Sequence, residues 1–69
     1  MLKIKVGQIY RSYITDTVYV ISNMINGIST IFSDGSCGRM PETNIREAVL
    51  IAEYPSWQEA VSSKEFKNK

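Results

Sequence analysis

The sequence predicts a mainly β domain, a small curled antiparallel meander or partly open barrel of short strands with a short α-helix near the C-terminus. Three observations carry this prediction. The first is a stretch rich in β-branched and aromatic residues, and the second is the two turn-forming pairs that divide it, Asn26-Gly27 and Asp34-Gly35. Asn-Gly favours a tight hairpin because both residues accept a positive φ. The third observation is a serine–glutamate capping box over residues 56–59, which predicts a helix start.

The expected elements follow the apolar periodicity and the turn residues in chain order. Strands are expected over residues 2–6, 8–14, 17–25, 28–33, 36–40 and 47–53, and the helix over residues 57–64. Residues 1–66 would form one domain, and residues 67–69 a frayed C-terminal tail.

The first expected strand, over residues 2–6, alternates apolar residues with Lys3 and Lys5. Lysines on the solvent side suit an edge strand because they discourage unwanted strand pairing. Gly7 then permits a bend or bulge before the second strand.

The central hairpin is the most strongly patterned part of the sequence. A two-residue turn at Asn26-Gly27 would place Ile21 opposite Phe32 and Ile25 opposite Ile28. Alternation then puts apolar side chains on both faces. One face carries Tyr19, Ile21, Ile25, Ile28 and Phe32, and the other carries Val18, Val20, Met24 and Ile31.

Because neither face of this hairpin is polar, both need cover. We expect a curled interior on one side and a helix or a partner chain on the other. A chain of 69 residues buries only about 60% of the surface that its unfolded form exposes. The sequence therefore predicts surplus apolar surface, and with it self-association or a protein partner.

The segment after Pro41 has two interpretations. Proline ends the preceding strand because it cannot donate to a β-ladder. Residues 41–45 suit a single 3₁₀ turn or a loop. Residues 46–53 have helix propensity, yet their apolar run between two prolines also suits a buried last strand, which is the interpretation we adopt.

The C-terminal helix should begin after Ser56, whose side chain caps it while Glu59 completes the box. Trp57, Ala60 and Val61 form one apolar stripe. Phe66 lies on the opposite side of an ideal helix, so we expect the helix to end or bend near residue 63 and Phe66 to pack separately.

Composition narrows the function classes. The chain has eight Lys and Arg, seven Asp and Glu, no histidine and one cysteine, for a net charge of +1. This balance argues against a strong field for nucleic acids or membranes. No apolar run is long enough to form a signal peptide or to span a membrane. A lone cysteine without an export signal fits the reducing cytoplasm.

Catalysis is not expected. The commonest general base, histidine, is missing. Cys37 has no evident base to form its thiolate, and we expect a small buried or half-buried thiol on a strand. No metal cluster, phosphate loop or disulfide framework is present in the sequence, so no cofactor is expected.

Two resemblances add to this reading. The opening Val6-Gly7-Gln8-Ile9-Tyr10 and the strand order over about residues 3–53 resemble SH3-like barrels. That resemblance implies a small, partly open barrel, and it does not fix a function. The segment over residues 54–61, with the Lys-Glu-Phe that follows at residues 64–66, resembles small proteins of bacteriophages and prophages. This second resemblance implies a host-interaction or regulatory role.

The leading functional hypothesis is a non-enzymatic module that acts through protein–protein contacts, with a homodimer as one way to cover the surplus surface. Tyrosine, methionine and arginine are typical interface anchors. The candidate partner-binding residues are Tyr10, Arg11, Tyr13, Met24 and Arg39. A small ligand held in a dimer crevice remains a third option.

The alternative hypothesis is a small barrel that binds single-stranded nucleic acid. Such proteins stack bases on aromatic side chains over a basic face. The aromatic and basic candidates are Tyr10, Tyr13, Tyr19, Phe32, Arg11, Arg39 and Lys3.

Overall fold

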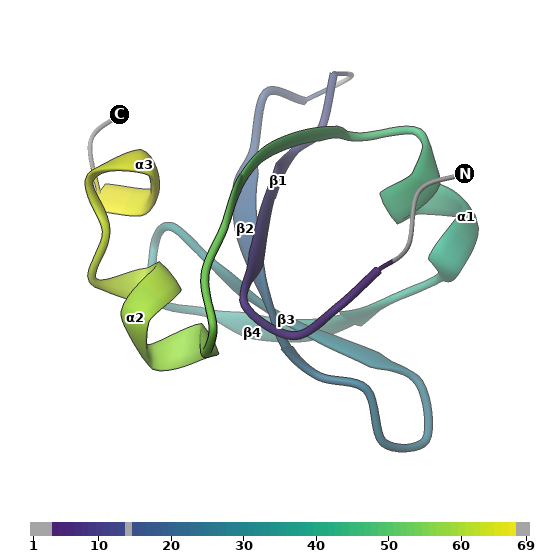
Figure 1. The fold of residues 1–69 in the computed structure, drawn as a ribbon. Coiled ribbons are helices and arrows are strands. Elements are labelled where there is room, and N and C mark those ends of the chain that lie inside the picture. Colours follow the sequence, from purple (N-terminus) through teal and green to yellow (C-terminus); the bar gives the residue numbers. More distant parts are fainter. Residues whose placement is uncertain (1–3, 14, 68–69) are drawn as a thin grey trace.

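The computed structural model describes residues 4–13 and 15–67 of the chain. This part holds five strands and three short helices (Figure 1). In chain order they are β1 (Gln8–Arg11), β2 (Val18–Asn23), β3 (Ile28–Phe32), β4 (Cys37–Met40), α1 (Glu42–Arg46), β5 (Val49–Glu53), α2 (Trp57–Val61) and α3 (Lys64–Lys67).

The strands form one antiparallel sheet in the order β4-β3-β2-β1-β5. The first four make a meander, and α1 carries the chain across so that β5 pairs with the free side of β1. The sheet curls, with α1 on one side and α2 and α3 on the other (Figure 1). The predicted mainly β fold, a curled antiparallel meander, is confirmed. The sheet is open, and its two edges are β4 and β5.

The first core cluster, which we call the helix-side cluster, lies between the sheet and the C-terminal helices. Its buried members are Ile9 and Val20 from the sheet, Ala60 from α2 and Phe66 from α3. Trp57 is partly buried and packs against them. The two short helices thus cover one face of β1 and β2.

The second cluster, which we call the inner cluster, fills the concave side of the sheet. Tyr10 and Tyr19 stack with ring centroids 6.1 Å apart, and Ile21 and Ile45 complete the buried set. Ile45 comes from α1, so this five-residue helix closes one end of the curl.

Alternation along β1 and β2 divides these residues between the clusters. The prediction that the hairpin is apolar on both faces is confirmed. The expectation that the chain is too small to cover both faces is wrong along the middle of β2, where Tyr19, Val20 and Ile21 are each 1% exposed or less, whereas Met24 and Ile25 at the hairpin tip are exposed. The concave interior covers one face, and α2 and α3 cover the other.

The predicted register of the central hairpin is also wrong. Ile21 lies opposite Thr30, and Tyr19 lies opposite Phe32, with an irregularity before Asn23. The turn is longer than two residues because the Asn23 Oδ1 accepts a hydrogen bond from the Ile25 N–H at 2.6 Å. The shifted register brings the Tyr19 and Phe32 rings into an edge-to-face contact at 5.9 Å, a favourable aromatic geometry.

The strand expected over residues 2–6 is absent from its described part. Residues 1–3 lie outside the described residues, and residues 4–6 lead into a turn. The Gln8 N–H donates to the Lys5 carbonyl at 3.3 Å, and the Lys5 N–H donates to the Gln8 Oε1 at 2.7 Å. These bonds take the backbone groups that an edge strand would have offered to a neighbour.

The other strands are shorter than predicted. The strand expected over residues 8–14 ends at Arg11, because the Ser12 N–H donates to the Thr17 carbonyl and closes a turn. Those expected over 17–25, 28–33 and 36–40 correspond to β2, β3 and β4, trimmed at their turns.

For residues 46–53 the strand interpretation is confirmed, and a short helix forms just before that strand. Residues 42–46 form α1, in place of the expected 3₁₀ turn or loop, and the last strand is β5, which covers 49–53 of the predicted 47–53. An ion pair four residues apart, Arg46 Nη2 to Glu42 Oε2 at 2.6 Å, supports the helix. Burial of Ile45 anchors it.

The C-terminal helix breaks as expected. The Ser56 side chain accepts from the Glu59 N–H at 3.3 Å, and α2 ends at Val61. After two serines, α3 begins and buries Phe66. Lys67, expected in the tail, is the last residue of α3, and residues 68–69 lie outside the described residues.

Candidate functional site

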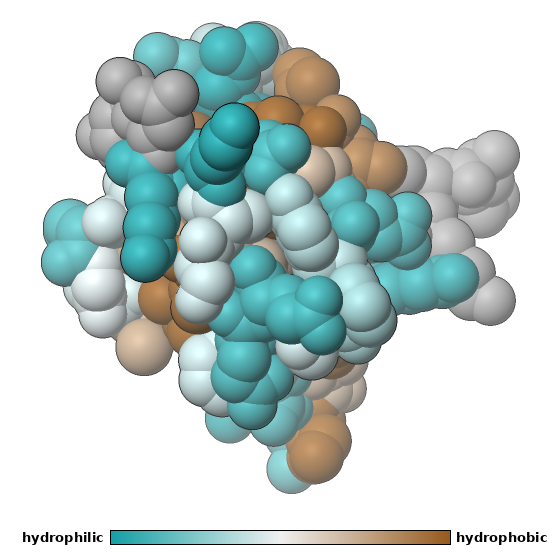
Figure 2. Space-filling model, turned by 60° about the vertical axis from the view of Figure 1, so that its left-hand side comes forward, coloured by the Kyte–Doolittle hydropathy of each residue, from teal (hydrophilic) through white to brown (hydrophobic). Residues whose placement is uncertain are grey.

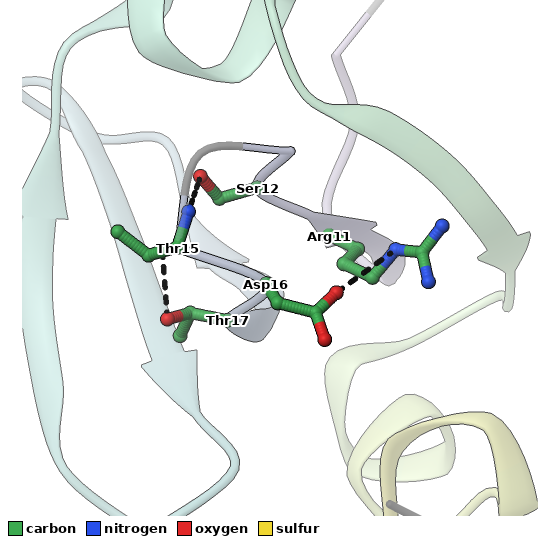
Figure 3. Close-up of polar contacts among 5 residues, drawn as sticks. All are labelled: Arg11, Ser12, Thr15, Asp16 and Thr17. Carbon is green, nitrogen blue, oxygen red and sulfur yellow. Dashed lines mark hydrogen bonds and ion pairs between the residues drawn. The ribbon is translucent and has the colours of Figure 1, made fainter.

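The turn between β1 and β2 is held by a local polar network (Figure 3). The Asp16 N–H donates to the Ser12 carbonyl at 2.8 Å, and the Thr15 hydroxyl donates to that of Thr17 at 2.9 Å. The Asp16 carboxylate lies 3.6 Å from the Arg11 Nε. Asp16 has a φ of 60°, a conformation that aspartate tolerates better than most residues. These contacts tie the described residues of the turn to one another.

A pocket of about 270 Å³, which we call the loop pocket, lies between this turn and α1. Side chains from the β1–β2 turn form one wall, and α1 and the residue after it form the other. Aromatic and sulfur-containing side chains of β2, β3 and β4 complete the lining. The lining residues are Ser12, Tyr13, Thr15, Thr17, Tyr19, Phe32, Met40, Asn44 and Glu47.

Two tyrosines give this pocket its character. Tyr13 is 64% exposed at the rim, where a partner could contact its ring. Tyr19 is buried, and its hydroxyl has no hydrogen-bond partner among the described residues. Burial, with a smaller contribution from the nearby Tyr10, raises the pKa of Tyr19 to about 12. Tyr19 therefore stays neutral at physiological pH.

The lining of the loop pocket has both apolar and polar side chains. It combines apolar surface from Phe32 and Met40 with hydroxyls, one amide and the carboxylate of Glu47. This mixture of apolar surface and a few polar groups is typical of recognition sites. In the described part of the chain, no three His, Cys, Asp or Glu side chains gather where they could hold a metal ion.

The structure separates the five residues predicted to bind a partner. Tyr10 is fully buried in the inner cluster and cannot contact a partner. Arg11 and Tyr13 lie together at the β1–β2 turn. Met24 and Arg39 lie at the other end of β2, where the Arg39 Nη1 donates to the Asn26 carbonyl at 2.8 Å.

Part of the pocket escaped the sequence analysis. Asn44 and Glu47 reach it only because α1 folds over the end of the sheet, and Met40 enters from the edge strand β4. Thr43 and Asn44 are weak helix formers, so the local sequence carries little signal for α1. The patterning of the hairpin indicated a buried Phe32, with no sign that it also borders a pocket.

The tip of the β2–β3 hairpin is a second exposed apolar feature. Met24 is 42% and Ile25 is 71% exposed. The hairpin is the lowest part of the molecule in Figure 1, and hydrophobic side chains stand out at the bottom of the mostly hydrophilic face in Figure 2.

Burial weakens the nucleic-acid hypothesis. Tyr10 and Tyr19, two of its four stacking candidates, are at most 1% exposed. Two of its cations already have contacts, since Arg11 lies beside Asp16 and Arg39 binds the hairpin carbonyl. Lys3 lies outside the described residues.

Comparison of this chain with protein-family models, with curated proteins and with solved structures finds no match. Within residues 4–13 and 15–67, every helix is too short or too polar to cross a membrane. Cys37 is exposed, where the sequence predicted a buried or half-buried thiol, because β4 is an edge strand.

Proposed function

We propose that the protein is a non-enzymatic binding module that recognises a partner protein by seating one of its side chains in the loop pocket. The observation that carries the proposal is this pocket itself. It combines apolar and polar lining side chains, and the exposed ring of Tyr13 borders it. Tyrosine at the rim of a pocket is a common interface anchor.

The size of the pocket supports a side chain as the occupant. A cavity of about 150 Å³ holds a benzene molecule, and drug-sized ligands need about 300 Å³ or more. The loop pocket, at about 270 Å³, fits one aromatic or long aliphatic side chain. Glu47 at the rim favours a lysine or arginine next to that anchor in the partner, because opposite charges attract.

The exposed thiol of Cys37 supports placing this module in the cytoplasm. Exposed free thiols persist in reducing compartments and are oxidised or paired outside them.

A peptide-display selection against the purified protein tests the proposal, followed by NMR mapping of the selected peptides. We expect peptides with a large apolar residue beside a basic one, and amide shifts centred on residues 12–17 and 42–47. Asn44→Trp should abolish binding because Asn44 lines the pocket and is itself exposed. Thr43→Trp, on the same helix and away from the lining, is the matched control.

Selected peptides that bind Asn44→Trp as well as the parent, or that shift residues elsewhere, would refute the pocket as the binding site. Titration with single-stranded DNA and RNA addresses the alternative function. Binding that weakens steeply with salt would replace the protein-binding proposal, because phosphate contacts release counterions.

A further inference from the structure

The second edge of the sheet, β5, carries an unusual run of exposed apolar residues. Val49, Leu50 and Ile51 are 46%, 37% and 39% exposed. Among the described residues β5 pairs only with β1, so the backbone groups along its other side face away from the sheet. It is the green segment between α1 and α2 in Figure 1.

A β-bulge explains part of this exposure. Ile9 lies opposite Ala52 and Tyr10 lies opposite Leu50, so Ile51 is the extra residue in β5. A bulge bends its strand and interrupts the alternation of side chains between the two faces. Neighbouring apolar residues are therefore turned outward, and neither core cluster includes any of the three.

Acidic residues border this apolar run. Glu47 precedes β5 and Glu53 ends it, and both are exposed. Neither forms an ion pair within the part of the chain that the structure describes. The outer edge thus presents negative charge, apolar surface and negative charge in turn.

We propose that the outer edge of β5 receives an extended segment of a partner protein by strand addition, a segment with apolar residues at its centre and lysine or arginine at both ends. Main-chain hydrogen bonds would supply affinity, and the apolar and acidic side chains of β5 would supply selectivity. This proposal goes beyond the loop pocket and does not depend on it.

The charges select against a second copy of the chain as the occupant. The antiparallel register that pairs the most apolar residues sets Leu50 against Leu50 and Val49 against Ile51. The same register sets Glu47 against Glu53 at both ends, and like charges directly opposite are destabilising. Natural edge strands use such charges to prevent self-pairing.

The other edge strand is a poorer acceptor. β4 presents an exposed cysteine and an exposed arginine, and Gly38 offers no side chain to pack. Glycine in a strand interior weakens it. The two edges therefore differ in both apolar surface and charge, and β5 is the one suited to a basic, apolar strand.

Binding of three synthetic peptides tests the proposal on the full chain. Each has about seven residues, enough to span a typical strand. The first alternates valine and threonine between terminal lysines, the second has terminal glutamates, and the third repeats the first with alternate backbone nitrogens methylated. Fluorescence anisotropy gives the affinities, and NMR amide shifts locate the site.

We expect the lysine-ended peptide to bind about ten-fold more tightly than the glutamate-ended one. Its terminal charges attract Glu47 and Glu53, whereas those of the glutamate-ended peptide repel them. Amide shifts should centre on residues 49–53, and methylation of the peptide backbone should abolish binding. Glu53→Lys should remove the preference for lysine ends. Glu59→Lys, an exposed acid on α2, should leave it intact.

Absence of binding, or binding that tolerates backbone methylation, would overturn strand addition. Equal affinity for both unmethylated peptides would overturn the charge selection. Light scattering of the protein alone tests for self-pairing. A dimer whose amide shifts fall on β5 would show that a second copy of the chain occupies this edge and would overturn the proposal. Loss of lysine-ended binding in Asn44→Trp, with the shifts at residues 12–17, would assign the peptide to the loop pocket instead.

Discussion

At the scale of single residues, the polar groups of the inner cluster are unequally satisfied. The Tyr10 hydroxyl donates to the Gln8 Oε1 at 2.7 Å, and the Lys5 N–H donates to the same oxygen. Gln8 is only 3% exposed, so these bonds compensate for its loss of water. The neighbouring Tyr19 hydroxyl is buried without a partner among the described residues.

The first prediction follows from this contrast. Tyr19→Phe should stabilise the protein by about 1 kcal/mol at neutral pH, because an unsatisfied buried hydroxyl is removed. Tyr10→Phe is the matched control and should destabilise by about 1 kcal/mol, since it deletes a satisfied bond. Urea denaturation measures both. A destabilised Tyr19→Phe protein would mean that the hydroxyl has a favourable partner.

Stability at high pH gives a second prediction. Burial raises the pKa of Tyr19 from 10.0 to about 12. Below pH 10 both folded and unfolded chains hold the proton, and the stability is fully present. Between pH 10 and 12 the unfolded chain releases it first, so stability should fall by about 2 kcal/mol as pH rises. Tyr19→Phe should lose distinctly less over the same range, and an equal loss would contradict the assignment to Tyr19.

Glycine substitution offers a third prediction. Gly7 has a φ of +96°, and a Cβ there would collide with the carbonyl oxygen of Tyr54. Gly35 has a φ of +94° and no atom near its Cβ position among the described residues. Gly35→Ala should therefore cost about 1 kcal/mol from backbone strain alone, and Gly7→Ala about 3 kcal/mol from strain and collision. Thermal denaturation compares them, and equal losses would argue against close packing of the chain at Gly7.

At the scale of elements, local signals predicted what local interactions determine. The Ser56 cap and the break before Phe66 follow from neighbouring residues, and the structure has both. The chain also reverses at Asn26-Gly27 and at Gly35 with positive φ, but the first of these turns is longer than the two residues expected. The hairpin register did not follow, because an Asn23 side-chain bond and a Tyr19 ring contact with β3 decide it. Such contacts depend on the folded sheet.

The absence of a strand over residues 4–6, the described part of the first expected strand, has a similar cause. Its alternating sequence suits a strand. A strand still needs a neighbour with free backbone groups, and both sides of β1 are occupied, by β2 and β5. The Gly7 N–H instead bonds the Ile21 carbonyl at 2.9 Å, and its carbonyl accepts from the Tyr54 N–H at 3.0 Å. The sequence holds no signal for this competition.

The shortest helix gives the fourth prediction. α3 has four residues, too few to be stable by itself, so burial of Phe66 in the helix-side cluster must hold it. Phe66→Ala should cost about 3 kcal/mol. Lys64→Ala, on the same helix with an exposed side chain, should change stability by less than about 0.5 kcal/mol. Urea denaturation followed by Trp57 fluorescence measures both, and a small effect of Phe66→Ala would mean that α3 is dispensable.

At the scale of the whole molecule, the candidate site shows where sequence reasoning ends. Arg11 and Tyr13 were proposed from the sequence because tyrosine and arginine are residue types that anchor interfaces. Asn44 and Glu47 were not, because their place in the pocket depends on how α1 crosses the end of the sheet. Tyr10 was misassigned because the sequence does not show which face of β1 the chain itself covers.

The surplus apolar surface was predicted in the wrong place for a related reason. The hairpin interior is covered, and the exposed apolar residues lie at the hairpin tip and along β5 instead. The bulge in β5 and the hairpin turn point these side chains outward. The positions of the bulge and of the turn cannot be found by counting alternate residues.

The last prediction concerns cooperativity. The helix-side and inner clusters lie on opposite faces of the sheet, yet both are built from the same two strands: Ile9 alternates with Tyr10, and Val20 with Tyr19. Loss of packing in one cluster disorders β1 and β2, and the other cluster needs the same two strands. Unfolding should therefore be a single two-state transition.

Two probes on opposite faces of the sheet test this. Trp57 fluorescence reports the helix-side cluster, and the NMR methyl signal of Ile45 reports the inner cluster. Their urea midpoints should coincide in the parent protein. They should also coincide in Phe66→Ala, where damage on one face must lower the midpoint on the other. An Ile45 signal that keeps the parent midpoint in this variant would show that the two faces of the sheet fold independently.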